Sequence, residues 1–354
     1  MKEANLPDLP PEPASTLRLQ LDRDALAANW QALDCLSGKA AAGAAVKANG
    51  YGLGAGDVAA VLRQAGARNF FVAHWGEVAA VLAQVPAAEI SVLHGPLTSE
   101  DAAFARAAGV RPTLNSLYQA RLWLDAGGGP CDLMVDTGMN RLGLSMDEIG
   151  NYLVASLDVD LLLSHLASAD EDSALNALQL GRFAEACAAI PAKRRSLANS
   201  AGIALGQAYH FDLTRPGIAL YGGVPRGELD GQIGQVAFPQ AALIQCRTIH
   251  AGDTIGYNAT FTASRSMRVG VASIGYADGF LRAWANGGEL AHGDARLPVL
   301  GRVSMDMVVV DLSAAPGLGE GDWLDIPYRL PEASALTGLS QYELLTILGR
   351  RFAR

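Results

Sequence analysis

The stretch Ala41-Ala42-Gly43-Ala44-Ala45-Val46-Lys47-Ala48-Asn49-Gly50-Tyr51-Gly52, residues 41–52, joins an apolar run to a lysine and a glycine-rich turn. A short apolar run without polar alternation is typical of a strand buried on both faces, as in parallel sheets. Lys47 follows this run directly, and α/β barrels place their chemistry at the carboxyl ends of their strands. The stretch therefore predicts a buried parallel strand with a candidate functional residue at its end.

The same pattern recurs along the chain, with Ala/Leu-rich helical stretches between the apolar runs, such as Gly56–Gln64, Thr98–Ala107 and Ser173–Ala189. Roughly eight such repeats in about 200 residues predict a (β/α)₈ TIM-type barrel rather than an open dinucleotide-binding sheet. No G-x-G-x-x-G follows the first strand, which also disfavours the open sheet. After residues 41–46, the predicted strands are Phe70–Ala73, Ile90–Leu93, Val110–Thr113, Asp132–Val135, Val159–Leu163, Ser196–Ala198 and, more weakly, Phe211–Leu213.

The pattern changes after about residue 235, where short strand-like segments alternate with Gly-rich turns. We expect a disordered Pro-rich tail over residues 1–15, a barrel over 16–235 and a mostly-β domain over 236–354. The strand Leu17–Leu21 could join either domain. The segments predicted in the β domain are Ala242–Thr248, Arg268–Ile274, Leu297–Met305 and Met307–Leu312, followed by a last helix over Gln341–Arg350.

The composition excludes several classes of function. A formal net charge of -9 argues against binding a nucleic-acid backbone. The four cysteines form no C-x-x-C pair, so no structural metal is expected. The amino-terminal residues lack the apolar stretch of a signal peptide, and no run is long enough to span a bilayer. We therefore expect a soluble cytoplasmic protein.

Polar residues stand where the predicted barrel strands end, which would place them on one rim. Lys47 would be partly desolvated there, which favours the neutral amine that a Schiff base requires. The turns after strands seven and eight occupy the position where such barrels often bind phosphate, and Ser200 adds a hydroxyl donor. The strand-end segments are Asp136–Arg141, Ser164–His165, Asn199–Gly202 and Thr214–Ile218.

Each of these residues also has a simpler interpretation. A single lysine after a strand is usually a solvated surface residue. His165 could be a hydrogen-bonded core histidine, or its planar ring could stack on a flat cofactor. Arg141 could form a structural ion pair with Asp136, or its guanidinium could bind a substrate carboxylate. Either phosphate turn alone could be an ordinary Gly/Ser turn.

Taken together, these segments resemble the alanine racemase family over nearly the whole chain, from Leu19-Gln20-Leu21-Asp22 to the last helix. Several motifs occur in the family's order, and that order makes the resemblance specific. The matching stretches are residues 46–52 (VKANGYG), 136–143 (DTGMNRLG), 215–218 (RPGI), 256–260 (GYNAT), 275–279 (GYADG) and 301–306 (GRVSMD).

The resemblance implies a fold-type III pyridoxal 5'-phosphate enzyme that interconverts L-alanine and D-alanine. It also implies a head-to-tail homodimer in which the partner's β domain completes each site. The catalytic bases would be Lys47, which also carries the cofactor, and Tyr257 of the partner subunit. The cofactor would contact Lys47, Tyr51, His165, Ser200, Arg215, Gly217 and Ile218, and the substrate would contact Arg141, Tyr276, Met305 and Asp306.

This chain departs from the family's pattern at three places. Leu53 stands where many members have histidine. Met134 stands where many members have a lysine, often carbamylated, that supports the arginine matched by Arg141. The family's late phosphate-contacting tyrosine has no clear match in the last helix, and Arg350 is a candidate for its place.

Two other functions remain open at this point, and the β domain argues against a third. A racemase of broader specificity, for example toward serine, would use the same chemistry, and a barrel-type decarboxylase would need a roomier pocket. A non-catalytic cofactor carrier would lack the β domain. The product D-alanine is a precursor of cell-wall peptidoglycan, but the sequence does not distinguish D-alanine biosynthesis from catabolism.

Overall fold

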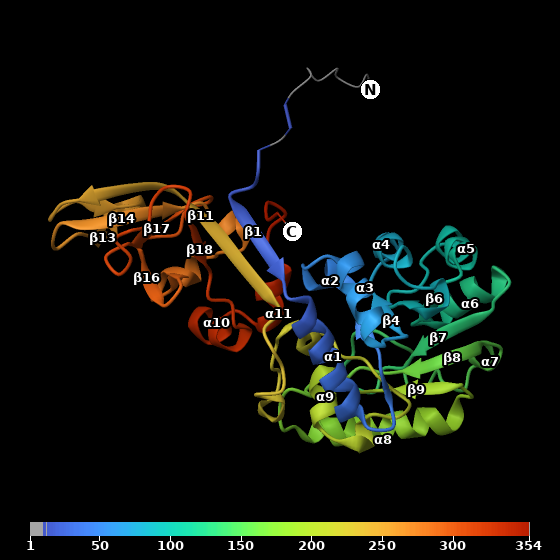
Figure 1. The fold of residues 1–354 in the computed structure, drawn as a ribbon. Helices are drawn as coiled ribbons and strands as arrows, with labels where there is room; N and C mark the ends of the chain where they lie inside the picture. Colours follow the sequence, from blue (N-terminus) through green and yellow to red (C-terminus); the bar gives the residue numbers. More distant parts are fainter. Residues whose placement is uncertain (1–9, 12, 354) are drawn as a thin grey trace. The chain divides into compact units, whose positions relative to one another are not determined.

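The computed structural model describes residues 10–11 and 13–353, and most of the predicted tail lies outside these residues. The chain divides into two compact units (Figure 1). The first contains residues 22–236 and 341–346. The second contains residues 237–340 and 347–353 together with the described residues up to Leu21.

Parallel strands form the centre of the first unit. Seven strands pair in the order β3 to β9, and β2 pairs with β10. The ring closes because the N–H of Gly43, between β2 and β3, donates to Thr214 O, and the N–H of Arg215 donates to Ala198 O. The strands are β2 (Ala41–Ala42), β3 (Ala44–Ala45), β4 (Phe70–Val72), β5 (Ile90–Val92), β6 (Arg111–Leu114), β7 (Pro130–Met134), β8 (Asp158–Leu163), β9 (Arg194–Ser196) and β10 (Leu213–Thr214). The predicted barrel is confirmed.

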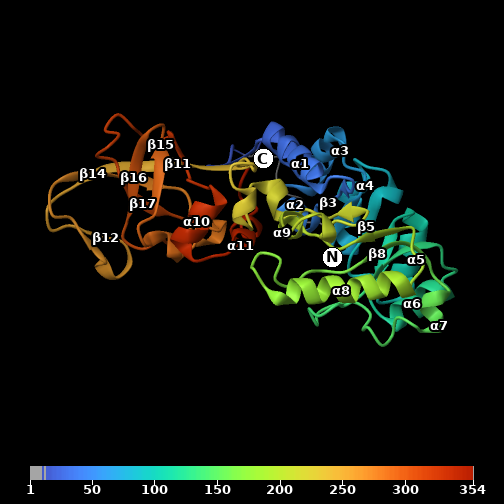
Figure 2. The same ribbon diagram turned by 90° about the horizontal axis from the view of Figure 1, so that it is seen from below.

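Helices follow the strands and lie outside the ring, as Figures 1 and 2 show for α5, α6 and α8. The side chains of Thr98, Ser116 and Ser173 accept backbone N–H groups at the starts of these three helices, so local sequence defines where each begins. The helices are α1 (Arg23–Ser37), α3 (Ala55–Ala65), α4 (Val78–Leu82), α5 (Ser99–Ala108), α6 (Leu117–Asp125), α7 (Tyr152–Ala155), α8 (Ala174–Ala189) and α9 (Ser200–Ala204).

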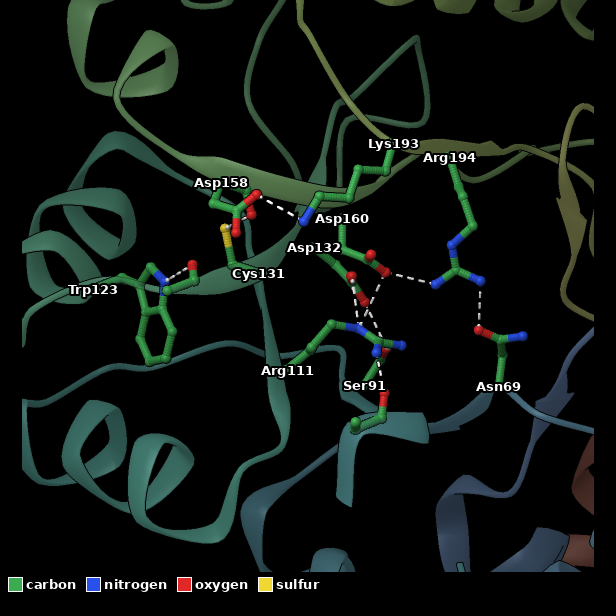
Figure 3. Close-up of polar contacts among 12 residues, drawn as sticks. Asn69, Ser91, Arg111, Trp123, Cys131, Asp132, Asp158, Asp160, Lys193 and Arg194 are labelled. Carbon is green, nitrogen blue, oxygen red and sulfur yellow. Dashed lines mark hydrogen bonds and ion pairs between the residues drawn. The ribbon is translucent and has the colours of Figure 1, made fainter. Parts of the chain in front are cut away.

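A layer of charged side chains fills the amino-terminal side of the barrel interior (Figure 3). Arg111 Nε lies 3.2 Å from Asp132 and 3.6 Å from Asp160, and Arg194 contacts Asp160 at 2.6 Å. Ser91 donates to the fully buried Asp132 at 2.5 Å. Burial raises the pKa of Asp132, and Arg111 opposes that shift. These charges therefore pair with one another on the side of the barrel away from the carboxyl ends of the strands.

The second unit is antiparallel, in the order β1-β11-β14-β17-β16-β15-β18, and β18 also pairs with β11. Leu17 to Leu21 pair with Ala241 to Ala237, so this strand belongs to the β unit. The strands are β1 (Leu17–Leu21), β11 (Ala237–Ile249), β14 (Met267–Ala272), β15 (Glu289–His292), β16 (Ala295–Leu300), β17 (Val308–Asp311) and β18 (Trp323–Asp325). A short hairpin consists of β12 (Thr254–Ile255) and β13 (Phe261–Thr262).

The structure corrects the predicted bounds of several elements. The strand predicted over residues 41–46 is divided into β2 and β3, the one predicted over Ser196–Ala198 is β9, which ends at Ser196, and the one predicted over Phe211–Leu213 is β10, which begins at Leu213. The predicted strand Leu297–Met305 stops at Leu300, because Gly301 adopts a left-handed conformation with φ 71°. The last helix, α11, covers Gln341–Thr346 and belongs to the first unit, while a helix that was not predicted, α10, covers Leu330–Thr337. Within the described part of the chain, no helix has the length and apolar character needed to cross a membrane.

Candidate active site

The carboxyl ends of the barrel strands surround a cavity of about 730 Å³. The sequence motifs that end β3, β7, β8, β9 and β10 all reach this cavity, because parallel strands present their carboxyl ends to one rim. Every residue that the sequence assigned to the barrel part of the site lines it: Lys47, Tyr51, Arg141, His165, Ser200, Arg215, Gly217 and Ile218.

Lys47 lies half-buried at the end of β3. Burial lowers the pKa of its ammonium, Arg141 and Arg215 lower it further, and the carboxylate of Glu77 opposes them. An amine in this environment loses its proton more readily than a solvated lysine and is a better nucleophile and base.

Arg215 is buried at the end of β10, where three neutral acceptors bind its guanidinium. One Nη donates to Ser196 Oγ at 2.5 Å, and the other donates to Ser164 O at 2.5 Å and to Leu197 O at 3.4 Å. Burial lowers the pKa of Arg215 to about 10, and the charge of Asp132 partly offsets this shift. The guanidinium therefore stays protonated at neutral pH and acts as a donor.

His165 follows β8 between these cationic groups. Burial lowers the pKa of its imidazole to about 3, with smaller contributions from Arg215, Arg141 and Lys47. Gln179 of α8 donates to the backbone carbonyl of His165 at 3.0 Å and so supports this strand end from outside. The ring is neutral at physiological pH, which leaves it suited to contact with a flat, apolar group.

The two predicted phosphate turns contact each other directly. Ser200 Oγ accepts the N–H of Gly217 at 2.8 Å and the N–H of Ala219 at 3.2 Å. Tyr51 packs against the same turn, and a Cβ atom added at Gly217 would clash with its hydroxyl. This glycine thus permits the backbone and the Tyr51 hydroxyl to lie close together. Backbone donors and two hydroxyl groups gather here, as an anion requires.

Arg141 is carried by a loop that Asp136 organises. The carboxylate of Asp136 accepts the backbone N–H groups of Gly138, Met139 and Arg141 at 2.8–2.9 Å. Burial raises the pKa of Asp136, but hydrogen bonds from the loop's N–H groups outweigh it, and the net shift is downward. Asp136 therefore binds the backbone of the loop, and the salt bridges of the described residues include none between its carboxylate and the Arg141 guanidinium.

Met134 lies nearly buried in the cavity wall, where it contributes no charge to Arg141. Among the described residues, Asp136 supports Arg141 instead, by accepting its backbone N–H.

The remaining predicted site residues belong to the β unit. Backbone hydrogen bonds join the two segments that carry Tyr276 and Met305. The N–H of Tyr276 donates to Ser304 O, and the N–H of Ala277 donates to Met305 O. Asp306 contacts Arg351 at 2.7 Å. Tyr257 lies between β12 and β13, and it is 66% exposed.

Sequence reasoning missed two residues that line the cavity, His94 and Tyr342, and two beside it, His74 and Glu77. His94 follows β5 and His74 follows β4, and their rings meet edge to face with centroids 4.1 Å apart. His94 lines the cavity, and the same strand-end rule that selected Lys47 would have found it. Glu77 lies next to Lys47, as described below.

Tyr342 of α11 also lines the cavity, with its ring centroid 6.4 Å from that of Tyr51. No local pattern marks it, because α11 reaches the barrel only through tertiary packing. The alternative considered from sequence, Arg350, is wrong for this cavity, since Arg350 lies in the β unit and lines a different one.

A nucleophilic amine, a cluster of anion-binding donors, a buried guanidinium donor and a second guanidinium thus share one cavity. This set can hold a flat anionic group attached to Lys47 and a carboxylate-bearing substrate beside it. No cluster of three or more potential metal ligands occurs among the described residues.

Comparison with known proteins gives consistent results over the whole chain. Residues 21–225 match the family model "Alanine racemase, N-terminal domain", and residues 236–354 match "Alanine racemase, C-terminal domain". Alanine racemase of Dinoroseobacter shibae is 43% identical over 351 residues, covering 96% of this chain and 98% of that protein. Biosynthetic alanine racemase of Agrobacterium fabrum is 40% identical over 365 residues, covering 96% and 93%.

Solved structures show the same likeness. The crystal structure of alanine racemase from Bartonella henselae with covalently bound pyridoxal phosphate superimposes with a TM-score of 0.87 at 36% identity. The match covers 97% of this chain and 99% of that one.

Proposed function

The chain belongs to the alanine racemase family, and we propose that it interconverts L-alanine and D-alanine with pyridoxal 5'-phosphate as its cofactor. The observation that carries the proposal is the convergence of Lys47, Arg141 and the Ser200–Gly217 turns on one cavity. The related protein from Bartonella henselae holds this cofactor covalently.

The residues of the cavity fit the cofactor. Lys47 would supply the amine that carries it, and Tyr51, Ser200, Gly217, Ile218 and Tyr342, which line the same cavity, would hold its phosphate. Arg215 would face the pyridine nitrogen and His165 the ring. Bound pyridoxal phosphate supplies the electron sink that makes the Cα proton of an amino acid removable. A protonated Arg215 would leave the ring nitrogen unprotonated, which moderates that sink and suppresses side reactions such as transamination.

Racemisation requires a proton to leave one face of Cα and another to arrive on the opposite face. We assign Lys47 Nζ to the D-alanine side and Tyr257 Oη of the partner subunit to the L-alanine side. The guanidinium of Arg141 would bind the substrate carboxylate, with Tyr276, Met305 and Asp306 enclosing the small side chain. Holding the carboxylate fixes the orientation of Cα between the two bases.

The assignment of Tyr257 requires a homodimer, in which each β unit completes the site of the other copy. The 66% exposure of Tyr257 and the 53% exposure of Met305 support this, because both side chains are available to a second chain. We also propose that the barrel unit, residues 22–236 with 341–346, binds the cofactor and that the β unit completes the substrate pocket. Cytoplasmic supply of D-alanine for cell-wall peptidoglycan is the role that we assign to this chain. The relative from Agrobacterium fabrum is a biosynthetic alanine racemase, which supports the biosynthetic part.

The proposal is tested by incubating the cofactor-loaded protein with a panel of L-amino acids in D₂O. Chirality, α-deuteration and released CO₂ are measured together. We expect alanine to be racemised fastest and to acquire deuterium at Cα without loss of CO₂. Faster turnover of serine would indicate the broader racemase, and CO₂ release would indicate a decarboxylase; either result would contradict the proposal.

A further inference from the structure

The carboxylate of Glu77 joins two strand ends at the cavity. Oε1 accepts the backbone N–H of Ala48 at 2.6 Å. Oε2 accepts the N–H of Ala73 at 2.7 Å and that of His74 at 3.2 Å. Ala48 follows Lys47 in the chain, whereas Ala73 and His74 follow β4. One side chain therefore fixes the turn that carries Lys47 to the neighbouring strand.

That turn needs such support, because its backbone is left-handed. Ala48, Asn49 and Tyr51 have φ values of 53°, 54° and 53°. Non-glycine residues are disfavoured in this conformation relative to the right-handed form. Asn49 Oδ1 accepts the N–H of Ala55 at the far end of the turn. Glu77 provides the corresponding anchor at the end next to Lys47.

Glu77 also supplies negative charge beside Lys47, whereas the other charged groups that shift the pKa of Lys47 are cationic. Arg141 and Arg215 act on Lys47 from the loops after β7 and β10 and disfavour its ammonium form, and Glu77 opposes them. His94 and His165 also interact electrostatically with Lys47. Among these groups Glu77 is the one that carries a carboxylate.

We propose that Glu77 is a positioning residue for Lys47, fixing the left-handed turn behind its Cα and setting the protonation of Nζ through its charge. Glu77 need not touch the substrate, because both effects pass through Lys47. The inference rests on the proposed function only in so far as Lys47 is a catalytic base. Its geometric content stands on the contacts of Glu77 alone.

The first test does not depend on activity. The full-length chain, freed of cofactor, is labelled with acetic anhydride over a range of pH, and acetylation of Lys47 is followed by peptide mass spectrometry. In Glu77→Gln the labelling midpoint should move to lower pH, because the ammonium loses its nearby carboxylate. Glu77→Asp retains the charge with a shorter reach, and its midpoint should lie closer to that of the wild type.

Hydrogen exchange of the backbone separates the anchoring effect from the charge effect. The peptide containing Ala48 should exchange faster in both Glu77→Gln and Glu77→Asp, since neither can reproduce all three hydrogen bonds. Asp101→Asn is the matched control. Asp101 accepts the N–H groups of Leu97 and Thr98 in the next βα unit, so its loss should leave Lys47 labelling and the Ala48 peptide unchanged.

The second test uses the cofactor-loaded enzyme and the α-proton exchange of each alanine enantiomer in D₂O. Glu77→Gln should slow exchange of D-alanine at least about tenfold, while exchange of L-alanine changes by less than about threefold. Equal losses for both enantiomers would show a merely structural role, and an unmoved labelling midpoint would overturn the electrostatic part. If the wild type fails to racemise alanine, the proposed function fails, whereas the labelling result still decides the inference.

Discussion

The hydroxyl of Ser200 accepts the backbone N–H of Gly217 at 2.8 Å, which links the turn after β9 to the turn after β10. Replacing Ser200 by alanine removes this acceptor and the proposed donor for the cofactor phosphate. Loss of a hydrogen bond to a charged group costs about 1.5–3 kcal/mol. We therefore expect Ser200→Ala to weaken pyridoxal phosphate binding by at least about tenfold in an absorbance titration.

Ser173→Ala provides the control for that variant. Ser173 caps the outer helix α8, so its loss should lower stability by about 1 kcal/mol without changing cofactor affinity. Equal cofactor affinity of the two variants would show that the phosphate does not bind at these two turns.

Asp136 should control substrate affinity through the loop of Arg141. An asparagine at this position has one acceptor oxygen and cannot accept all three N–H groups that Asp136 now binds. We expect Asp136→Asn to raise KM for alanine by about tenfold and to change kcat by less than about threefold. A variant with an unchanged KM would show that Arg141 is positioned without this loop.

The two proposed bases can be separated by isotope exchange. The equilibrium constant of racemisation is unity, so kcat/KM must be equal in both directions and cannot distinguish the bases. We expect Tyr257→Phe to lose racemisation and α-proton exchange of L-alanine, while Lys47 still exchanges the α-proton of D-alanine. Nuclear magnetic resonance in D₂O measures both exchanges. Retained exchange of L-alanine would show that another group acts on that face.

His165 should make stability depend on pH. Its pKa is lowered to about 3 in the folded chain, against about 6.5 for an unperturbed histidine. The unfolded chain therefore binds more protons between these values, and the stabilisation is present above pH 6.5 and lost as pH falls toward 3. Between pH 6 and pH 4.5 the wild type should lose roughly 2 kcal/mol more than His165→Gln in urea unfolding. Parallel pH profiles of the two proteins would contradict the burial of a neutral imidazole.

Features that depend on neighbouring residues in the chain could be predicted from the sequence, whereas features that depend on tertiary contacts could not. Apolar runs and the residues directly after them are local features, so the strands, Lys47 and Ser200 were predictable. His94 obeys the same rule and was overlooked. Tyr342 reaches the cavity through the packing of α11, and the contact of Arg111 with Asp132 requires knowledge of which strands are neighbours. Likewise, the place of Leu17–Leu21 depends on its pairing with residues more than two hundred positions away.

Identification of the lysine that carries the cofactor is the most direct test of the account. The chain has four lysines, Lys2, Lys39, Lys47 and Lys193. Borohydride reduction of the loaded protein fixes the covalent link, and peptide mass spectrometry then locates the pyridoxyl group. We predict modification of Lys47 alone, and Lys47→Ala should lose both the modification and alanine racemisation. Modification of another lysine, or racemisation by Lys47→Ala, would contradict this prediction.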